Sequence, residues 1–349
     1  MPSSRRQPLS RGRRVFNLLV FVVVVAVGGV VLVVPLYRHL HPASPASPVA
    51  DAAAGSAAGR SASPGQSASP GQVQAGQTTP RPKSTTLRPD GLLFDDFHYT
   101  GGDDPSLRAH GWTIRTEGGG PGVHDTWTTD GVSFPSASDA QGGKALQLQL
   151  TSGGTKATTH QTELTTAEPQ FFTGTYAARI YFTDGPVSGQ NGDHINESFY
   201  AISPSTEKKN YSELDYEYMP NGGWGSPKPE LDATSWHSEK EGDRVYQPSY
   251  QRLHGWHTVM IVAVKGQTTY FLDGEKIFTS GADYSMRGPV NVAFSTWLID
   301  LPFTGQRTWN MQVNWFYYQA GKSLTLNDVN KSVNAYYSAG THYVNSLTR

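Results

Sequence analysis

The sequence contains no cysteine among its 349 residues, which excludes a disulfide framework and any metal site built on thiolates. It also lacks an excess of positive charge, since 28 basic residues stand against 29 acidic ones. The balance is uneven along the chain. Residues 1–87 carry nine basic residues and one acid, which leaves residues 88–349 with a net charge of -9. A domain of that charge would repel nucleic-acid phosphates, so a neutral or cationic partner is predicted instead.

Long apolar runs are absent except near the N-terminus. Residues 15–36 are apolar apart from Asn17, and these 22 residues, at a rise of about 1.5 Å each, would span roughly 33 Å. Five arginines precede the run. The positive-inside rule therefore predicts a basic cytoplasmic tail at 1–14, a signal-anchor helix at 15–37, and a domain outside the cell. The alternative is a cleaved export signal that would leave the domain secreted.

Aromatic residues are missing from the segment that follows. Residues 42–87 consist almost entirely of Ala, Ser, Pro, Gly, Gln and Thr, and the six residues 61–66 repeat directly as 67–72. Such a composition offers too little apolar surface to offset the entropy of ordering the chain. We therefore predict a disordered linker over residues 38–87, which would tether the next domain to the membrane.

The remainder, residues 88–349, has the pattern of one all-β domain. All eight tryptophans lie here, and residues 145–150 alternate strictly between apolar and polar side chains. Asp273-Gly274 between two apolar runs predicts a hairpin with a type I′ turn. One helix is expected, at residues 326–337. Many strands with few helices predict an antiparallel sandwich of two sheets. Further strands are expected at residues 175–182, 195–202, 212–219, 257–264, 290–298 and 311–318.

Three acidic residues stand out within one predicted strand. Glu213, Asp215 and Glu217 occupy alternate positions, so their side chains project from the same face. Retaining glycoside hydrolysis needs such a set, with one ionised carboxylate as nucleophile and one protonated carboxyl as acid, about 5–5.5 Å apart. A solvated acidic surface and a calcium site are the alternatives that the spacing alone leaves open. The residues expected to face the core are Leu214, Tyr216 and Tyr218.

At this point the chain resembles glycoside hydrolase family 16, the laminarinase and lichenase group with a concanavalin A-like jelly roll. The family's Glu-x-Asp-x-Glu signature matches residues 213–217 without a gap. Weaker similarities cover residues 92–319, and residues 320–349 would be a short helical extension. These weaker similarities to the family are found at residues 174–180, 256–258, 270–274, 289–297 and 314–317.

The resemblance implies a role for each acid. Glu213 would be the nucleophile, Glu217 the general acid and base, and Asp215 the assisting acid. The chain departs from the family at the strand before the acids, where residues 194–199 lack the usual Trp-Pro. Asn314 stands where the family often has a calcium-binding Asp. No cofactor is therefore expected, and calcium, if bound, would be structural only.

Six further residues are candidates for contact with a sugar. Aromatic rings beside the acids can stack on sugar faces, and polar groups can hydrogen-bond sugar hydroxyls. For each of them packing within its own loop or strand is the alternative. The candidates are Trp224, Trp236, Trp297, Gln161, Glu163 and His194.

Together these patterns predict a retaining, endo-acting glycosidase of a membrane-anchored bacterial type. Its substrate would be a β-linked, β-glucan-like polysaccharide outside the cell, and the protein would be a monomer. The alternative is a non-catalytic, lectin-like module on the same fold. A polysaccharide lyase is disfavoured, because the acidic domain lacks the basic surface that an acidic sugar requires.

Overall fold

The computed structural model describes residues 91–301 and 304–347. The predicted tail (1–14), signal-anchor helix (15–37) and linker (38–87) lie outside the described residues. In the part of the chain that is described, no helix is both long enough and apolar enough to cross a membrane.

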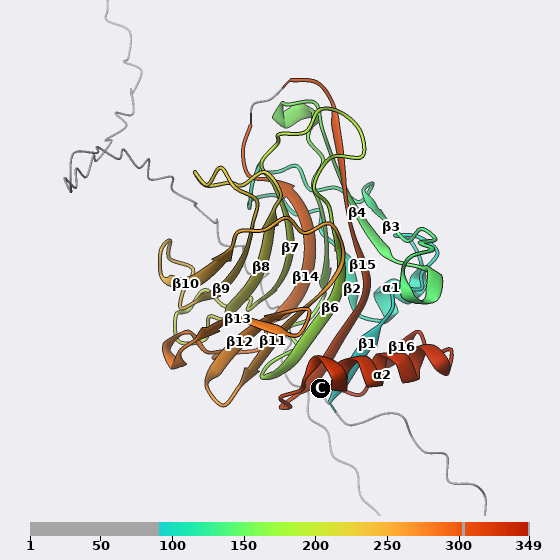
Figure 1. Ribbon diagram of the computed structural model, residues 1–349, viewed down its shortest axis with the longest axis vertical. Helices are drawn as coiled ribbons and strands as arrows, with labels where there is room; N and C mark the ends of the chain where they lie inside the picture. Colours follow the sequence, from blue (N-terminus) through green and yellow to red (C-terminus); the bar gives the residue numbers. More distant parts are fainter. Residues whose placement is uncertain (1–90, 302–303, 348–349) are drawn as a thin grey trace, which may run out of the picture. The chain divides into compact units, whose positions relative to one another are not determined.

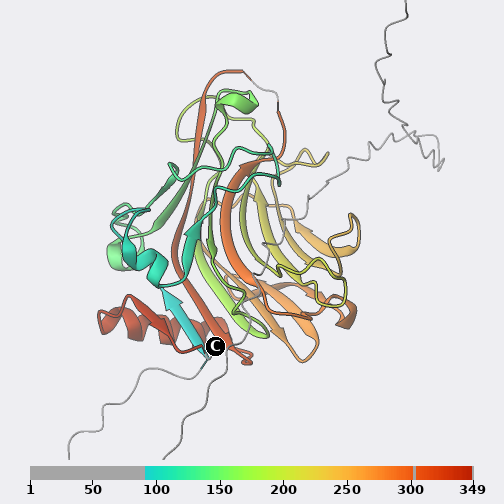
Figure 2. The same ribbon diagram turned by 180° about the vertical axis from the view of Figure 1, so that it is seen from behind.

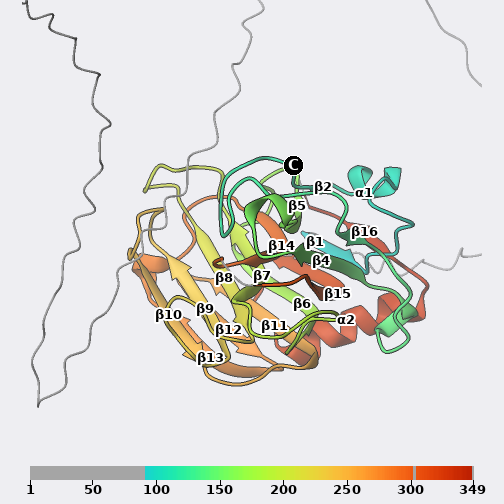
Figure 3. The same ribbon diagram turned by 90° about the horizontal axis from the view of Figure 1, so that it is seen from above.

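The described residues form two antiparallel sheets packed face to face (Figures 1 and 3), as the strand pattern predicts. The first sheet has seven strands, in the order β10-β9-β8-β7-β14-β5-β2. Several of its central strands bend along their length (Figure 1). Its strands are β2 (Trp112–Ile114), β5 (Thr162–Thr166), β7 (Ile195–Ile202), β8 (Glu213–Met219), β9 (Glu230–Trp236), β10 (Arg244–Ser249) and β14 (Asn291–Leu298).

The second sheet follows the order β13-β12-β11-β6-β15-β1-β16, with β4 pairing to β15 and β3 pairing to β4. A short helix α1 (Pro105–Ala109) precedes β2. The strands of this sheet are β1 (Leu92–Asp95), β3 (Val132–Ser133), β4 (Leu146–Ser152), β6 (Gly174–Phe182), β11 (Gly255–Val264), β12 (Gln267–Leu272), β13 (Glu275–Ser280), β15 (Arg307–Ala320) and β16 (Tyr343–Asn345).

The predicted hairpin is confirmed between β12 and β13. Asp273 has φ 52° and Gly274 has φ 87°, and a type I′ turn requires positive φ at both of its central residues. The expected strands at 195–202 and 212–219 correspond to β7 and β8, and the expected helix corresponds to α2 (Leu326–Ser338). The spacing of apolar side chains and the Asp-Gly pair were therefore sufficient to predict these elements.

Three strands of the first sheet, the three-residue β2 and the longer β9 and β10, were not predicted. In β9 the core-facing residues include the small Ala233 and Ser235, so the apolar alternation is weak. The outermost strand β10 is partly exposed and contains Pro248, which an edge strand tolerates because it need not donate a hydrogen bond there. Neither segment has the apolar pattern by which the other strands were found.

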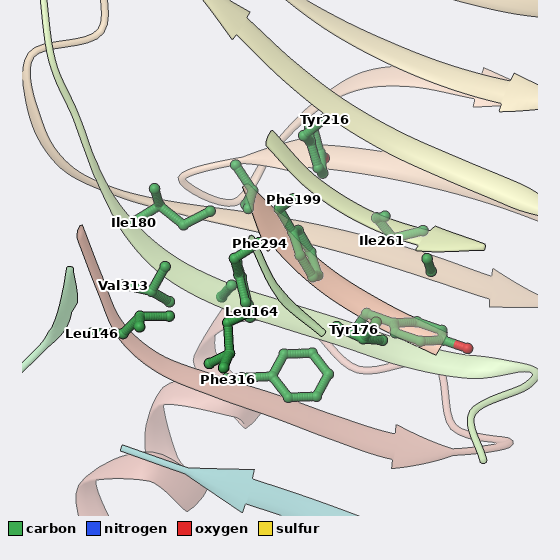
Figure 4. Packing of buried hydrophobic residues seen from close by; sticks show 14 of the residues in the cluster. Leu146, Leu164, Tyr176, Ile180, Phe199, Tyr216, Ile261, Phe294, Val313 and Phe316 are labelled. Carbon is green, nitrogen blue, oxygen red and sulfur yellow. The ribbon is translucent and has the colours of Figure 1, made fainter. Parts of the chain in front are cut away.

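The main core lies between the two sheets (Figure 4). Phe199 of β7 and Phe294 of β14 stack with their ring centroids 5.0 Å apart. Tyr216 of β8 is fully buried, and its hydroxyl donates to the carbonyls of Met260 and Phe271, both at 2.9 Å. These bonds join β8 to β11 and β12 across the sandwich. Leu214 and Tyr218 are buried beside Tyr216, so β8 must turn its odd-numbered side chains outward.

A second core lies on the opposite face of the second sheet, under α2 (Figures 1 and 2). Val329 and Val333 of α2 are buried there against Trp315, and Phe94 stacks on Tyr336 at 4.8 Å. Because β16 follows α2 and pairs with β1, the C-terminal segment is packed into the same sheet that contains the first strand.

Candidate functional site

The three acids of β8 project from the outer face of the seven-stranded sheet. Antiparallel pairing places Glu213 opposite Trp236, Asp215 opposite Thr234, and Glu217 opposite Asp232 of β9. Asp215 is buried, whereas Glu213 and Glu217 are partly exposed. The alternation of side chains along β8 thus presents all three carboxyl groups on one surface.

Each of the three carboxyl groups accepts a hydrogen bond from its own uncharged donor. The indole Nε1 of Trp236 donates to Asp215 at 2.8 Å, and the amide Nδ2 of Asn196 donates to Glu217 at 2.9 Å. The hydroxyl of Tyr211 donates to Glu213. These bonds restrict the orientation of each carboxyl group before any ligand binds.

Burial raises the pKa of all three acids above the usual range of carboxyl groups. Mutual repulsion adds to this effect: the charge of Glu213 raises the pKa of Glu217, and both of them raise the pKa of Asp215. The two Glu carboxyl groups therefore interact electrostatically, as a nucleophile and an acid must.

One cation, Arg244 of β10, was not predicted to belong to this site. Its guanidinium lies 4.7 Å from the ring centroid of Trp236 and 5.2 Å from that of Tyr246. The positive charge lowers the pKa of all three acids of β8 and so favours their ionised forms. These aromatic contacts hold the guanidinium in place, and within residues 91–301 and 304–347 it forms no ion pair with a carboxylate.

A fourth carboxyl group on this face, that of Asp232, was also missed. It lies opposite Glu217 in the pairing of β8 with β9, and it is 6% exposed. Burial, followed by the charges of Glu217 and Glu230, raises the pKa of Asp232 to about 7. Its Oδ1 is buried without a hydrogen-bond partner among the described residues.

A chain of hydrogen bonds leads from β14 to Glu217. Trp297 donates through its indole to Ser198 at 3.1 Å, Ser198 donates to Asn196 at 2.7 Å, and Asn196 donates to Glu217 at 2.9 Å. Asn196 and Ser198 alternate along β7 on the same face as the acids, a signal that the sequence carries. The orientation of Glu217 on β8 therefore depends on residues of two further strands, β7 and β14.

The three candidate tryptophans differ in exposure. Trp297 is 3% exposed, so most of its ring is unavailable to a ligand. Trp224 follows β8, is 36% exposed, and lies 6.0 Å from Trp297 between ring centroids. Trp236 is partly exposed beside Asp215. Trp224 and Trp236 thus offer aromatic surface on the acidic face, and Trp297 supports it from below.

The three polar candidates, Gln161, Glu163 and His194, differ in how exposed they are and in the partners they contact. Gln161 has no exposed surface, and its amide oxygen accepts from the backbone N–H groups of Val123 and Leu298 at 3.3 and 3.0 Å. Because its side chain is buried, Gln161 is not in a position to contact a sugar as predicted. It holds a loop against β14 instead. Its neighbouring loop covers it, which the sequence does not indicate.

Glu163 is buried in an ion pair with Arg115 at 3.3 Å and accepts a 2.6 Å bond from the hydroxyl of Tyr200. Tyr200 is paired directly with Asp215 in the sheet, so this group borders the three acids. His194 lies on the exposed surface and pairs with Asp300 at 3.0 Å.

Asn314, at the position considered for calcium, is buried. Its amide oxygen accepts from the backbone of Gln141 at 3.1 Å and from the guanidinium of Arg179 at 3.0 Å. A positive group thus occupies the oxygen that a cation would use, which disfavours calcium at this position.

No protein-family model and no curated protein matches the sequence. Among solved structures, the chain is similar to a β-glucanase of Bacillus licheniformis at 15% identity, covering 66% of this chain and 99% of that chain, with a TM-score of 0.49. A family 16 endo-glucanase from Bacteroides ovatus matches at 14% identity over 64% and 98% of the two chains, with a TM-score of 0.48. Similarities at this level assign no role to any residue of this chain.

Proposed function

We propose that the protein is a retaining, endo-acting glycoside hydrolase of the family 16 type, which cleaves a β-linked, β-glucan-like polysaccharide. The observation that carries this proposal is the arrangement of Glu213, Asp215 and Glu217. They share one face of β8, their pKa values are raised, and each is oriented by a separate donor. This is the chemistry that a two-step displacement needs.

In the first step, a carboxylate oxygen of Glu213 attacks the anomeric carbon and forms a glycosyl ester. The bond from that carbon to the leaving oxygen breaks, and Glu217 gives its proton to that oxygen. In the second step, Glu217 takes a proton from water while the water oxygen attacks the same carbon and releases Glu213. Two inversions at one carbon leave the product with the configuration of the substrate.

The electrostatics of the pair support this division of roles. In the free protein the charge of Glu213 raises the pKa of Glu217, which favours the protonated form that an acid requires. Once Glu213 is esterified its charge is gone, so the pKa of Glu217 falls and it can act as a base. Asp215, between them, would adjust this coupling through its own protonation.

The substrate would lie across the outer face of the first sheet. Trp224 and Trp236 supply aromatic surface for sugar rings, and Trp297 supports Trp224. The net charge of -9 beyond residue 87 suits a neutral polysaccharide. The chemistry requires no cofactor. As part of the same proposal, the protein would work as a monomer outside the cell, anchored through residues 15–37 or secreted after cleavage.

A non-catalytic glycan-binding module on the same fold is the second candidate. Binding alone does not require carboxyl groups with raised pKa values, and ionised groups would serve as well as acceptors for sugar hydroxyls. The raised pKa values of Glu213 and Glu217 therefore favour an enzyme.

The test is a hydrolysis screen of the full chain against β-1,3-, β-1,4- and mixed-linkage glucans, galactans and wall glycans. Glu213→Gln and Glu217→Gln should each lower the rate by about a thousandfold or more while the fold is retained. Glu275→Gln, on the exposed hairpin of the other sheet, serves as the matched control and should be unchanged. Binding of a glycan without any product would support the lectin-like module. Unaltered hydrolysis in both variants of β8 would refute the assignment.

A further inference from the structure

A second cluster of ionisable side chains lies where the C-terminal strand meets the first strand. Asp96 directly follows β1, His98 is two residues further on, and His342 directly precedes β16. The strands β1 and β16 are paired, and the backbone N–H of Asp96 donates to the carbonyl of His342 at 3.1 Å. One potential ligand atom of each side chain lies within 4.8 Å of the other two.

Only one of the two carboxyl oxygens of Asp96 has a hydrogen-bond partner among the described residues. Asp96 is 3% exposed, and its Oδ2 lies 2.8 Å from Nδ1 of His342. Its Oδ1 is buried without a hydrogen-bond partner in the described part of the chain. An unpaired oxygen of a buried carboxylate is unfavourable, because the water it loses on folding is not replaced by another hydrogen-bond donor. The position therefore calls for a further positive partner.

The donor set selects the kind of partner. Two imidazole nitrogens and one carboxylate oxygen suit Zn²⁺ and related transition metals, whereas calcium and magnesium prefer oxygen ligands alone. Both rings are exposed and stacked, with their centroids 4.0 Å apart, so an ion can reach them from solvent.

We propose that Asp96, His98 and His342 bind one divalent transition-metal ion of the Zn²⁺ class, which fastens the C-terminal segment to the first strand. Three protein ligands leave the fourth tetrahedral position for water. Ligand atoms around such an ion are about 3.3 Å apart, so the exposed rings would close by roughly an ångström. Lys144 lies close enough for its charge to act on His98, and that charge limits the affinity.

The consequence would be a structural clamp. His342 and Asp96 are 246 positions apart in the sequence, and the segment between β15 and His342 contains α2. An ion that binds only the folded arrangement adds to stability in proportion to the logarithm of its concentration above the dissociation constant. The clamp is independent of the acids of β8, so it holds or fails separately from the proposed hydrolase function.

The test uses the full chain, freed of metal with a chelator and then titrated with Zn²⁺ alone. The wild type should bind about one equivalent, and its melting temperature should rise by about 5 °C at saturation. His98→Ala, His342→Ala and the near-isosteric Asp96→Asn should lose both effects. His160→Ala, an exposed histidine on another segment, is the matched control and should keep both.

Cobalt offers a second readout, since Co²⁺ in a tetrahedral site with nitrogen and oxygen ligands absorbs visible light much more strongly than octahedral free Co²⁺ does. The wild type and His160→Ala should show this strong absorption, and His98→Ala should not. Absence of Zn²⁺ binding in the wild type would overturn the proposal, and so would equal binding by His98→Ala. A His342→Ala variant that is destabilised equally with and without Zn²⁺ would mean that Asp96 and His342 form an ion pair only.

Discussion

The indole Nε1 of Trp236 donates a 2.8 Å hydrogen bond to Oδ2 of Asp215, across the pairing of β9 with β8. It is the only hydrogen bond that Asp215's side chain makes within the described residues, since Oδ1 is buried without a partner. The same indole lies under the guanidinium of Arg244. Trp236 therefore both orients the middle acid and holds the cation that favours ionisation of the whole set.

Trp236→Phe keeps an aromatic ring but removes this donor. Because the bond lowers the pKa of Asp215, its loss should raise that pKa further and leave Asp215 more fully protonated. We expect kcat on a hydrolysed glucan to fall about ten- to a hundredfold, because the middle carboxyl group loses the donor that orients it. Trp256→Phe is the matched control, because Trp256 donates in the same way to Asp139 on the other sheet. Equal kcat values in the two variants would contradict this role.

Asn196→Ala should move the pH dependence of catalysis. The bond from Asn196 lowers the pKa of Glu217, which burial has raised to about 7. Without it the pKa of Glu217 should rise, so the acid keeps its proton to higher pH and the alkaline limb of kcat shifts upward. The measurement is kcat across pH 5–10 (about the range in which both limbs should fall). An alkaline limb that stays in place would show that Asn196 does not act on Glu217.

Gln161→Ala should affect stability more than catalysis. The Gln161 amide binds backbone groups of Val123 and Leu298, so the variant leaves buried polar groups unpaired. Denaturant unfolding should show a loss of about 1–3 kcal/mol, with kcat little changed. Gln149→Ala, on the partly exposed face of β4, should cost less. A large fall in kcat without loss of stability would contradict this and would indicate that Gln161 contacts the sugar.

Glu197 is fully buried in β7, and burial raises its pKa from 4.5 to about 8. A carboxyl group with a raised folded-state pKa binds its proton more tightly in the folded protein. Its contribution to stability is therefore complete below about 4.5 and is lost as the pH rises toward about 8, at about 1.4 kcal/mol for each unit of pH. Glu197→Gln should flatten that part of the unfolding free energy between pH 5 and 8. A wild-type slope retained in the variant would contradict this assignment.

The face of each side chain in β8 followed from sequence alone, because a strand alternates with a period of two and Leu214, Tyr216 and Tyr218 need a core. The turn at Asp273-Gly274 also followed from sequence alone, because an Asp-Gly pair separates two apolar runs there. These features depend on residues close together in the chain, where pattern and turn chemistry suffice.

The partners of the acids could not be predicted in the same way. Asp232, Arg244 and Asn196 reach the site through the pairing of separate strands, and that register depends on the assembled sheet. Gln161, by contrast, was predicted to contact the sugar but is buried. Gln161 directly precedes β5 and alternates with Glu163 as an outward residue, yet the loop of residues 121–127 covers it. No pattern in the neighbouring sequence indicates such a cover.

The most direct test of the central claim is chemical rescue by azide on an activated aryl β-glucoside oligomer. Glu213→Ala removes the nucleophile, and azide in the vacated space should attack the same face of the sugar and give an α-glycosyl azide. Glu217→Ala still forms the glycosyl ester, so azide should attack from the opposite face and give a β-glycosyl azide. NMR of the isolated products distinguishes the two configurations. The same configuration from both variants, or full hydrolysis without azide in either, would contradict the roles assigned to Glu213 and Glu217.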